Sequence, residues 1–338
     1  MAAFQQHLRS GAGDIDLLAV FARADEFRLI PVRAEERVEL QRLLERVPVP
    51  VRGDTDDGPM PKVAALLQAH VARLALPGFA LAADAVYVTQ SAARLFRALF
   101  ELSRARGWAR AARCALGWCK QVERRMWLAM SPLRQFGPDC PADLLRSVER
   151  KPLPWTRYLD LTEPELGELV GSPKAGRVLH RLVHLVPRLD VRAHVQPLTR
   201  SLLRFELRLT PDFVWNDAVH GSAEVFWVTI EDADGERLLH AEPLVIKRAY
   251  ATAEHLLEFT CALTEPLPPQ YFVAIDSDRW VGSDTRLAVS FRHLQLPDRA
   301  LPPTELLDMQ PLPVSELRDP EFEALYRGKL SEFNAVQT

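Results

Sequence analysis

One stretch of the chain, residues 91–125, concentrates positive charge that could bind phosphate. It holds nine basic residues against two acidic ones, a net charge of +7, so the remaining 303 residues of this −3 chain carry −10. Clustered positive charge in an otherwise acidic protein is typical of nucleic-acid binding. Five polar residues near its start share one helical face at spacings of four, three, four and three: Gln90, Arg94, Arg97, Glu101 and Arg104.

A stripe of arginine with hydrogen-bonding neighbours can contact successive phosphates or bases of a single strand. The stripe therefore predicts a nucleic-acid contact through Gln90, Arg94, Arg97 and Arg104. A solvated bundle face, with Arg94 and Arg97 paired to nearby carboxylates, would produce the same pattern, and the charges alone do not separate the two interpretations.

Two more residues could contact a strand. Trp108, just past this helix, could stack on a base, although a tryptophan at such a position is more often part of a core. The turn Gly-Ser-Pro-Lys-Ala-Gly at 171–176 places backbone N–H groups at a helix start, and Lys174 adds a positive charge that favours phosphate. The turn lacks the central glycine after proline of the usual helix-hairpin signature.

Motifs for catalysis or metal binding are missing from the sequence. It contains no GxxxxGK[ST] phosphate loop, no HExxH and no GxSxG, and its four cysteines form no CxxC pair. His180 and His184 lie four apart on one predicted helix, but a third metal ligand with a clear role is lacking. We therefore expect no catalytic residue, no metal and no cofactor in this segment. The cysteines are expected to be reduced, structural thiols.

The hydrophobic pattern predicts a multi-domain α + β chain in four parts. Residues 1–130 form a helical bundle, with one helix that ends at Arg106 and another over about 109–130, and residues 131–188 form a helix-loop-helix unit of short helices. Residues 189–296 change to an alternating pattern with about seven strands, which favours an immunoglobulin-like sandwich. Residues 297–338 are a proline-rich strap or linker. No run of about 20 apolar residues occurs, so we expect no membrane partner.

Local signals place several elements of the second and third parts. Thr162 with Glu165 matches a capping box that begins a helix ending near Gly171. Helices are also predicted over 142–149 and 174–183. Asp234-Gly235 indicates a hairpin turn between two strands. Strands are predicted over six segments: 203–209, 225–230, 238–247, 256–263, 271–276 and 286–293.

Longer runs resemble a known family. The runs are EFRLIPVRAEERVELQRLLERVPVPV, GFALAADAVYVTQSAARLFRALFE, SPLRQF, LPPQYFVAIDSDRW and LPPTELLDMQPLPVSEL. They resemble the Sec63-type region of tandem-cassette spliceosomal DExH RNA helicases, in the first cassette, and the resemblance spans nearly all of the chain. The ending FNAVQT looks like the FNPxQT that opens the second cassette, with Ala335 in place of proline. The resemblance therefore implies a fragment of a longer helicase.

The resemblance implies a role and partners. In that family the region contains bundle, helix-loop-helix and immunoglobulin-like parts, and the long ratchet helix of the bundle lies across the RNA path. Mapped onto this chain, the ratchet helix is about 88–106, and Ser91, Arg94 and Arg97 become the residues expected to touch RNA. Implied partners are U4/U6 snRNA, the RecA-like motor domains that use ATP and Mg²⁺, the second helicase cassette and a spliceosomal scaffold protein with a Jab/MPN domain. The implied location is the nucleus.

Rival interpretations remain open at this point. The chain could be a protein-interaction scaffold with no direct RNA role, or, less readily, an enzyme of an unusual kind. It could also be the equivalent region of the activating-signal cointegrator complex helicase, which shares SPLRQF and TELLD. The runs VTQSAAR and ERVPVPV fit the spliceosomal family better.

Overall fold

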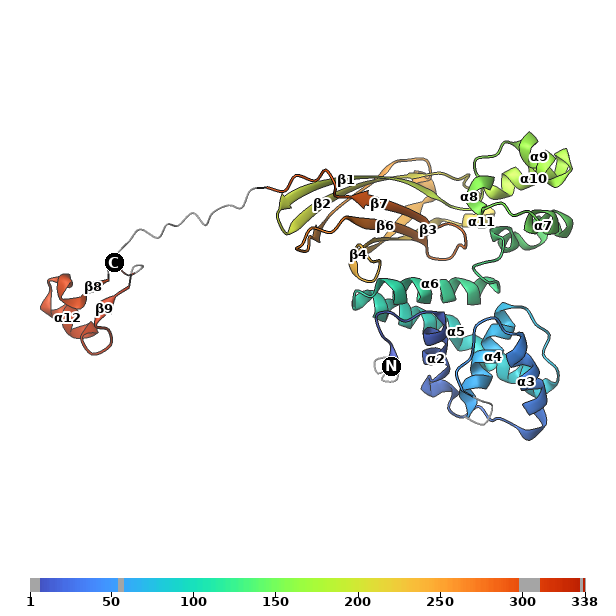
Figure 1. Ribbon diagram of the computed structural model, residues 1–338, viewed down its shortest axis with the longest axis horizontal. Helices are drawn as coiled ribbons and strands as arrows, with labels where there is room; N and C mark the ends of the chain where they lie inside the picture. The colour runs from blue at the N-terminus through green and yellow to red at the C-terminus, as the bar shows by residue number, and fades with distance from the viewer. Residues whose placement is uncertain (1–6, 54–57, 298–310, 335–336, 338) are drawn as a thin grey trace. The chain divides into compact units, whose positions relative to one another are not determined.

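The computed structural model describes residues 7–53, 58–297, 311–334 and 337. Two compact units divide the chain, residues 1–295 and residues 296–338. The first unit contains a helical part, a short-helix part and two β-sheets, which Figure 1 shows in chain order from blue to orange.

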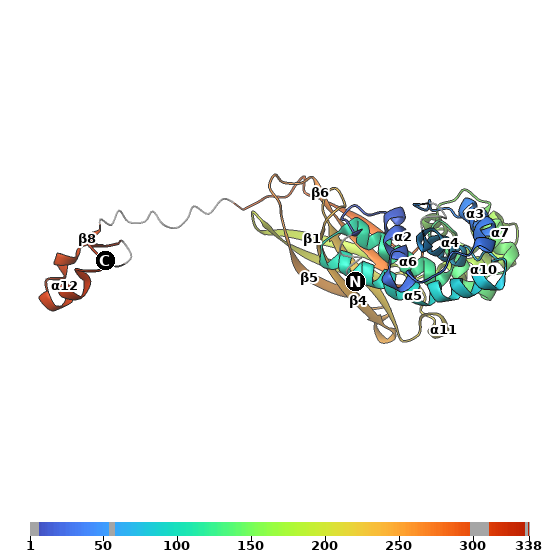
Figure 2. The same ribbon diagram turned by 90° about the horizontal axis from the view of Figure 1, so that it is seen from below.

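The helical part packs around an aromatic stack. Phe96 of the longest helix lies between Phe21 and Trp118, with ring centroids 4.8 and 5.2 Å apart. Figure 2 shows these helices from below, gathered beside one end of the strands. Within the described residues of this part the α-helices are α2 (Asp14–Ala22), α3 (Arg37–Arg46), α4 (Pro59–Val71), α5 (Phe79–Ala105) and α6 (Ala109–Arg124), with 3-10 turns at Asp25–Phe27 and Ala34–Glu36.

The ends of α5 and α6 follow from their caps. Gly78 precedes α5 with φ 77°, and Gly107 follows it with φ 69°, conformations that glycine adopts without strain. The prediction of a helix from 109 to 130 is wrong at its end, because α6 stops at Arg124 and Arg125 adopts a left-handed conformation. Arg73 donates hydrogen bonds to the carbonyls of Arg124 and Arg125, which satisfies the open end of α6.

The short-helix part confirms the predicted capping box and helix pair. The backbone N–H of Thr162 donates to Glu165 at 2.8 Å, and Gly171 ends the helix with φ 74°. Gly167 and Gly176 let two helices approach with almost no side chain between them. The elements of this part are η3 (Pro132–Asp139), α7 (Ala142–Glu149), α8 (Trp155–Tyr158), α9 (Glu163–Val170) and α10 (Pro173–Val183).

Replacing Gly176 by alanine should lower the free energy of unfolding by about 1–3 kcal/mol. The added Cβ would lie 2.5 Å from the Gly167 Cα and 2.8 Å from the Glu163 carbonyl oxygen, and both are backbone atoms that cannot rotate away. Urea denaturation at constant slope measures the loss. Gly328→Ala is the matched control, because a Cβ there meets nothing within 4 Å. Equal midpoints for the two variants would contradict the predicted close packing.

Seven strands form two antiparallel sheets, which confirms the expected strand number in the described part of residues 189–296. One sheet has the order β1-β2-β5 and the other β4-β3-β6-β7. The predicted strand list lacked β1, although its residues alternate in burial like those of the other strands. The strands are β1 (Leu189–Thr199), β2 (Leu202–Pro211), β3 (Ala223–Glu231), β4 (Leu238–Lys247), β5 (His255–Ala262), β6 (Gln270–Ser277) and β7 (Thr285–Ser290), with short helices α11 (Asp217–His220) and η4 (Arg248–Tyr250).

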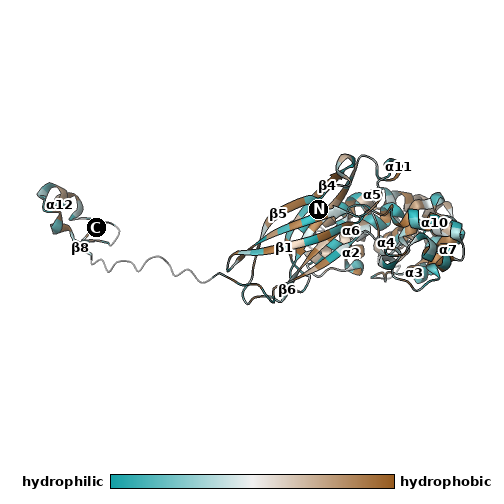
Figure 3. Cartoon of the chain, turned by 90° about the horizontal axis from the view of Figure 1, so that it is seen from above, coloured by the Kyte–Doolittle hydropathy of each residue, from teal (hydrophilic) through white to brown (hydrophobic). Residues whose placement is uncertain are grey.

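Alternation along the strands separates a buried face from a polar one. On β2, Phe205 and Leu207 are fully buried, while Arg204 and Arg208 on either side of them are exposed. Figure 3 shows this change of hydropathy from residue to residue along the strands. The four-part division and the immunoglobulin-like type of the sheets stay predictions.

Two tryptophans tie the sheets to the helical parts. Trp227 of β3 belongs to the core of the bundle, where it meets the Phe100 ring edge-on at 4.9 Å. Trp280, just after β6, belongs to the core of the short-helix part, where it lies 5.7 Å from Phe136. Each helical core is therefore completed by a residue of the β-sheet part.

The second unit contains short helical and strand elements. It holds α12 (Pro320–Tyr326), η5 (Val314–Leu317) and a small pair of strands, β8 (Leu312–Pro313) and β9 (Glu332–Phe333). The TELLD motif at 304–308 and Ala335 lie outside the described residues. Of the helices that the structure describes, none has the length and apolar character needed to cross a membrane.

Candidate nucleic-acid interface

The helix α5 is held on most sides and open along one. It packs against α6, α4 and α2, and its buried residues include Val88, Leu95 and Leu99. Its exposed residues recur every three or four positions over the first half of the helix. They are Phe79, Ala82, Ala83, Val86, Tyr87, Gln90 and Arg94.

The predicted contacts Gln90, Ser91 and Arg94 lie together at the middle of α5. Gln90 is exposed and Ser91 is half-buried. One guanidinium nitrogen of Arg94 donates to both carboxylate oxygens of Glu26, at 2.8 and 3.0 Å, with 67% of the arginine side chain exposed. An ion pair this exposed contributes at most about 1 kcal/mol, so Arg94 can exchange Glu26 for a phosphate at little cost.

Arg97 and Arg104 turn away from this open face and toward the β-sheets. The Arg97 guanidinium donates to the two carboxylate oxygens of Asp278 at 2.5 and 2.9 Å, and Asp278 also accepts from the Trp227 indole at 2.8 Å. Arg104 donates to Glu101 and lies 5.2 Å from the centre of the Trp227 ring. The five-residue stripe is therefore split, because its C-terminal half belongs to the junction between α5 and β3.

Trp108 also belongs to a junction. It forms an isolated antiparallel bridge with Arg237, flanked by hydrogen bonds between Gly107 and Leu238 at 2.8 Å and between Ala109 and Glu236 at 3.0 Å. Its half-buried ring packs against the bundle core. These hydrogen bonds hold the connection between α5 and α6 against the turn between β3 and β4.

Much of the basic stretch 91–125 faces acidic or carbonyl groups of the sheets. Besides Arg97, the side chain of Arg113 pairs with Glu231 at 3.0 Å and that of Lys120 lies 3.8 Å from Asp276. Arg124 donates to the Arg279 carbonyl at 3.0 Å and lies 4.6 Å from the Trp280 ring centre. The concentration of charge that suggested phosphate binding is thus largely an internal contact between two parts of the chain.

A second cationic face lies on α10. Lys174, Arg177 and Arg181 are exposed at spacings of three and four, and in the described part of the chain none of them has an ion pair or a side-chain hydrogen bond. The hydroxyl of Ser172 caps this helix by accepting from the Ala175 N–H at 3.4 Å. Of these three cations only Lys174 was predicted to contact a strand, although the spacing of the two arginines is visible in the sequence.

The two histidines are neighbours at the end of α10, and the four cysteines are free thiols. His180 and His184 have ring centroids 4.4 Å apart, and burial followed by the nearby His180 lowers the pKa of His184. Burial raises the pKa of Cys119 and of Cys261 to about 12, which makes their thiolates scarce. Within the described ranges, no group of three or more histidine, cysteine or acidic residues could hold a metal ion.

Comparisons with known proteins agree with this architecture. The family model of the Sec63 Brl domain matches residues 1–290. The U5 small nuclear ribonucleoprotein 200 kDa helicase of Homo sapiens is 50% identical over 335 residues, which cover 99% of this chain and 16% of that protein. The Drosophila melanogaster protein of the same name is 50% identical over 338 residues, and the pre-mRNA-splicing factor brr2 of Schizosaccharomyces pombe is 51% identical over 338 residues.

The alignments cover this chain completely but only a small part of each relative. The Drosophila and yeast alignments each include 100% of this chain but only 16% and 15% of the relatives. The matched segment contains α5 with its open face, the junction at Trp227 and the cationic face of α10. The chain belongs to the Sec63 family and is a Sec63 region of the type found in spliceosomal RNA helicases.

Proposed function

We propose that this chain is the accessory module of a spliceosomal RNA helicase and that the open face of α5 contacts the RNA strand. In this proposal Gln90, Ser91 and Arg94 hold the strand between power strokes of adjoining RecA-like motor domains. ATP and Mg²⁺ bind in those motor domains and not in this segment. Because the chain spans about one sixth of its curated relatives, the helicase activity itself is part of the proposal.

The observation that carries the proposal is the construction of α5. The helix runs for 27 residues and is fixed by its neighbours, yet it leaves a face open from Phe79 to Arg94 that carries two aromatic rings, small or aliphatic side chains, an amide and a guanidinium. Aromatic rings can stack on bases, and a guanidinium beside them can bind phosphate. A rigid helix with such a face can hold a strand without itself rearranging when the motor domains move.

The other predicted contact residues have different roles. Arg97, Arg104 and Trp108 position α5 against the sheets through Asp278, Trp227 and the bridge at Arg237. Lys174, with Arg177 and Arg181, supplies a second cationic face that guides the strand as it leaves. Three cations along one helix face, none of them ion-paired within the described residues, support this role better than the single lysine did.

The proposed partners follow from the family. They are U4/U6 snRNA, the motor domains, the second helicase cassette and a scaffold protein with a Jab/MPN domain, in the nucleus. The strand orders β1-β2-β5 and β4-β3-β6-β7 support an immunoglobulin-like sandwich that would dock proteins. The helicase of the activating-signal cointegrator complex remains the rival family member.

A protein scaffold without RNA contact is the second candidate function. Leu29 and Phe79 are 94% and 90% exposed, and Val86 and Tyr87 on α5 are also exposed, so apolar side chains are available to a protein partner. A salt titration separates the candidates, because RNA binding through several phosphates weakens steeply with salt while docking through an apolar patch does not.

Replacing Arg94 by glutamate should lower the affinity of the intact helicase for single-stranded RNA about tenfold, the loss expected when one contact of roughly 1.5 kcal/mol is removed. Unwinding should fall while the fold is unchanged, because the side chain is mostly exposed. The log–log salt slope of binding should decrease by about 1.

The matched control is Arg42→Glu. Arg42 is also an exposed arginine with an ion pair, to Glu39 on the same helix, but it lies on α3. Fluorescence anisotropy with a labelled oligonucleotide measures both variants. Unchanged RNA binding and unwinding in Arg94→Glu, or equal losses in both variants, would count against the role of α5.

A further inference from the structure

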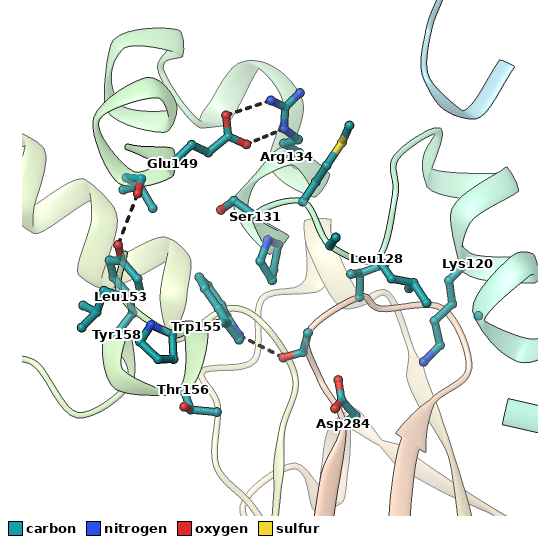
Figure 4. A pocket seen from close by; sticks show the side chains of 18 of the residues that line it. Lys120, Leu128, Ser131, Arg134, Glu149, Leu153, Trp155, Thr156, Tyr158 and Asp284 are labelled. Carbon is teal, nitrogen blue, oxygen red and sulfur yellow. Dashed lines mark hydrogen bonds and ion pairs between the residues drawn. The ribbon is translucent and has the colours of Figure 1, made fainter. Parts of the chain in front are cut away.

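A cavity of about 870 Å³ lies where α6, the short-helix part and the sheets meet. Figure 4 shows its walls, with Lys120 on one side, Leu153 and Trp155 on the other, and Asp284 on the loop after β6. The size falls in the range of ligand-binding pockets in proteins. None of the predicted RNA-binding residues lines it.

Lys120 is the unusual group of this cavity. Lys120 is 5% exposed, and its side chain points into the cavity in Figure 4. The nearest carboxylate oxygen, on Asp276, is 3.8 Å from the ammonium nitrogen, which is longer than a hydrogen bond. Its three N–H donors therefore have no hydrogen-bond acceptor among the described residues. An ammonium on so buried a residue, with one ion pair and no hydrogen bond to the described residues, favours an acceptor that enters the cavity.

Three other polar groups of the walls have partners. Arg134 forms two hydrogen bonds with Glu149, at 2.6 and 2.8 Å. Arg113 pairs with Glu231, which lies outside the cavity lining. The indole N–H of Trp155 donates to the Gly282 carbonyl at 2.9 Å. Of the buried or half-buried cations that line the cavity, Lys120 keeps its hydrogen-bond donors unused.

The apolar walls determine which chemical group could lie next to an acceptor that is bound to Lys120. They come from the connection after α6 and from the chain around α8, and they are fixed by close contacts. The Leu128 side chain packs closely against Gly117, where an added Cβ would lie 2.9 Å from its Cδ1 atom. The apolar lining residues are Leu128, Met130, Pro132, Leu153, Pro154 and Trp155.

We propose that this cavity binds a peptide segment of a partner protein, with Lys120 hydrogen-bonded to a carboxylate and the apolar walls covering the neighbouring side chain. The buried ammonium of Lys120 is one point charge and matches one carboxylate, whereas a phosphorylated metabolite requires several converging donors. Asp276 and Asp284 line the same cavity and would repel a multiply charged anion. Aliphatic and aromatic walls match the side chain beside an acidic residue in a peptide.

Three fragments of equal size test the proposal on the full chain: 3-phenylpropionate, its amide and phenethylamine. Chemical-shift titration of the tryptophan indole N–H signals, with Trp155 assigned by its phenylalanine variant, reports binding in the cavity. The carboxylate should shift the Trp155 signal and bind at least about tenfold more tightly than the amide or the amine, as expected for one charge-assisted hydrogen bond. Lys120→Met should abolish this preference, whereas Lys247→Met, at an exposed lysine, should retain it.

Every outcome decides the proposal. Preference for the carboxylate that disappears in Lys120→Met supports it. Preference for the amine would assign the cavity to Asp276 and Asp284 and overturn it. Equal binding of all three fragments, carboxylate binding that survives Lys120→Met, or no shift at Trp155 would overturn it as well. If Lys120→Met does not fold, Lys120→Arg, which keeps the charge, should retain the preference for the carboxylate over the amide.

Discussion

Replacing Lys62 by methionine should lower the free energy of unfolding by about 3–5 kcal/mol, the loss expected when one partner of a buried charge group is removed. Lys62 is fully buried on α4, where its ammonium donates to Glu36, to Asp84 at 2.7 Å and to the Pro31 carbonyl at 2.7 Å. Methionine has a similar volume but lacks the ammonium whose positive charge balances the carboxylates of Glu36 and Asp84. The loss is measured from the shift of the urea concentration at the unfolding midpoint, with the denaturant slope unchanged.

The same cluster makes stability depend on pH in a defined direction. Burial alone would raise the pKa of Glu36, but hydrogen bonds from Lys62 and from Arg33 lower it below its usual value, and the pKa of Asp84 is lowered by Arg33 and Lys62 in the same way. A lowered folded-state pKa stabilises the protein above the unfolded pKa, and the stabilisation is lost as pH falls through the folded pKa. The difference between wild type and Lys62→Met should therefore shrink below about pH 4.5, the usual pKa of glutamate.

Two controls separate burial from charge. Lys247→Met changes an exposed lysine and should leave stability within about 0.5 kcal/mol of wild type. Adding Glu36→Gln and Asp84→Asn to Lys62→Met should recover part of the loss, because the unpaired charges are removed. A loss of less than about 1 kcal/mol for Lys62→Met, or a loss that does not change with pH, would contradict the assigned cluster.

Replacing Glu224 by leucine should cost about 3 kcal/mol, at the lower end for a broken buried pair because the partner Arg279 is partly exposed. Glu224 of β3 is fully buried and accepts from Arg279 at 2.5 and 3.1 Å and from the Trp280 indole at 3.1 Å. Arg279 in turn donates to the His220 carbonyl at 2.8 Å. Leucine would leave the buried Trp280 indole N–H without a partner at the junction with the short helices.

Thermal unfolding followed by tryptophan fluorescence measures this loss. Glu224→Gln keeps an acceptor for the Trp280 indole and should cost less than Glu224→Leu. Glu258→Leu is the matched control, because Glu258 pairs with Arg204 on an exposed face, where such pairs contribute at most about 1 kcal/mol. Equal losses for Glu224→Leu and Glu258→Leu would show that the buried acceptor is not important for the junction.

Local signals were sufficient for most individual elements. The capping box at Thr162 and Glu165, the glycines around α5 and the alternation along β2 act through neighbours in sequence, so the sequence determines them. The end of α6 was missed because its cap comes from Arg73, about fifty residues earlier. The first strand, β1, was missed because its outer residues include polar and charged groups on one face of an edge strand.

The sequence by itself determined the helical and β-sheet parts, the family and the helix on which the RNA contact is proposed. Only the tertiary structure decided which charges face solvent, because an arginine meets its carboxylate through folding and not through spacing. Arg97 reaches Asp278 across 181 positions, and Trp227 and Trp280 enter helical cores that precede them in the chain. A basic stretch in sequence thus became an internal junction, while Arg94 and the cations of α10 remained at the surface.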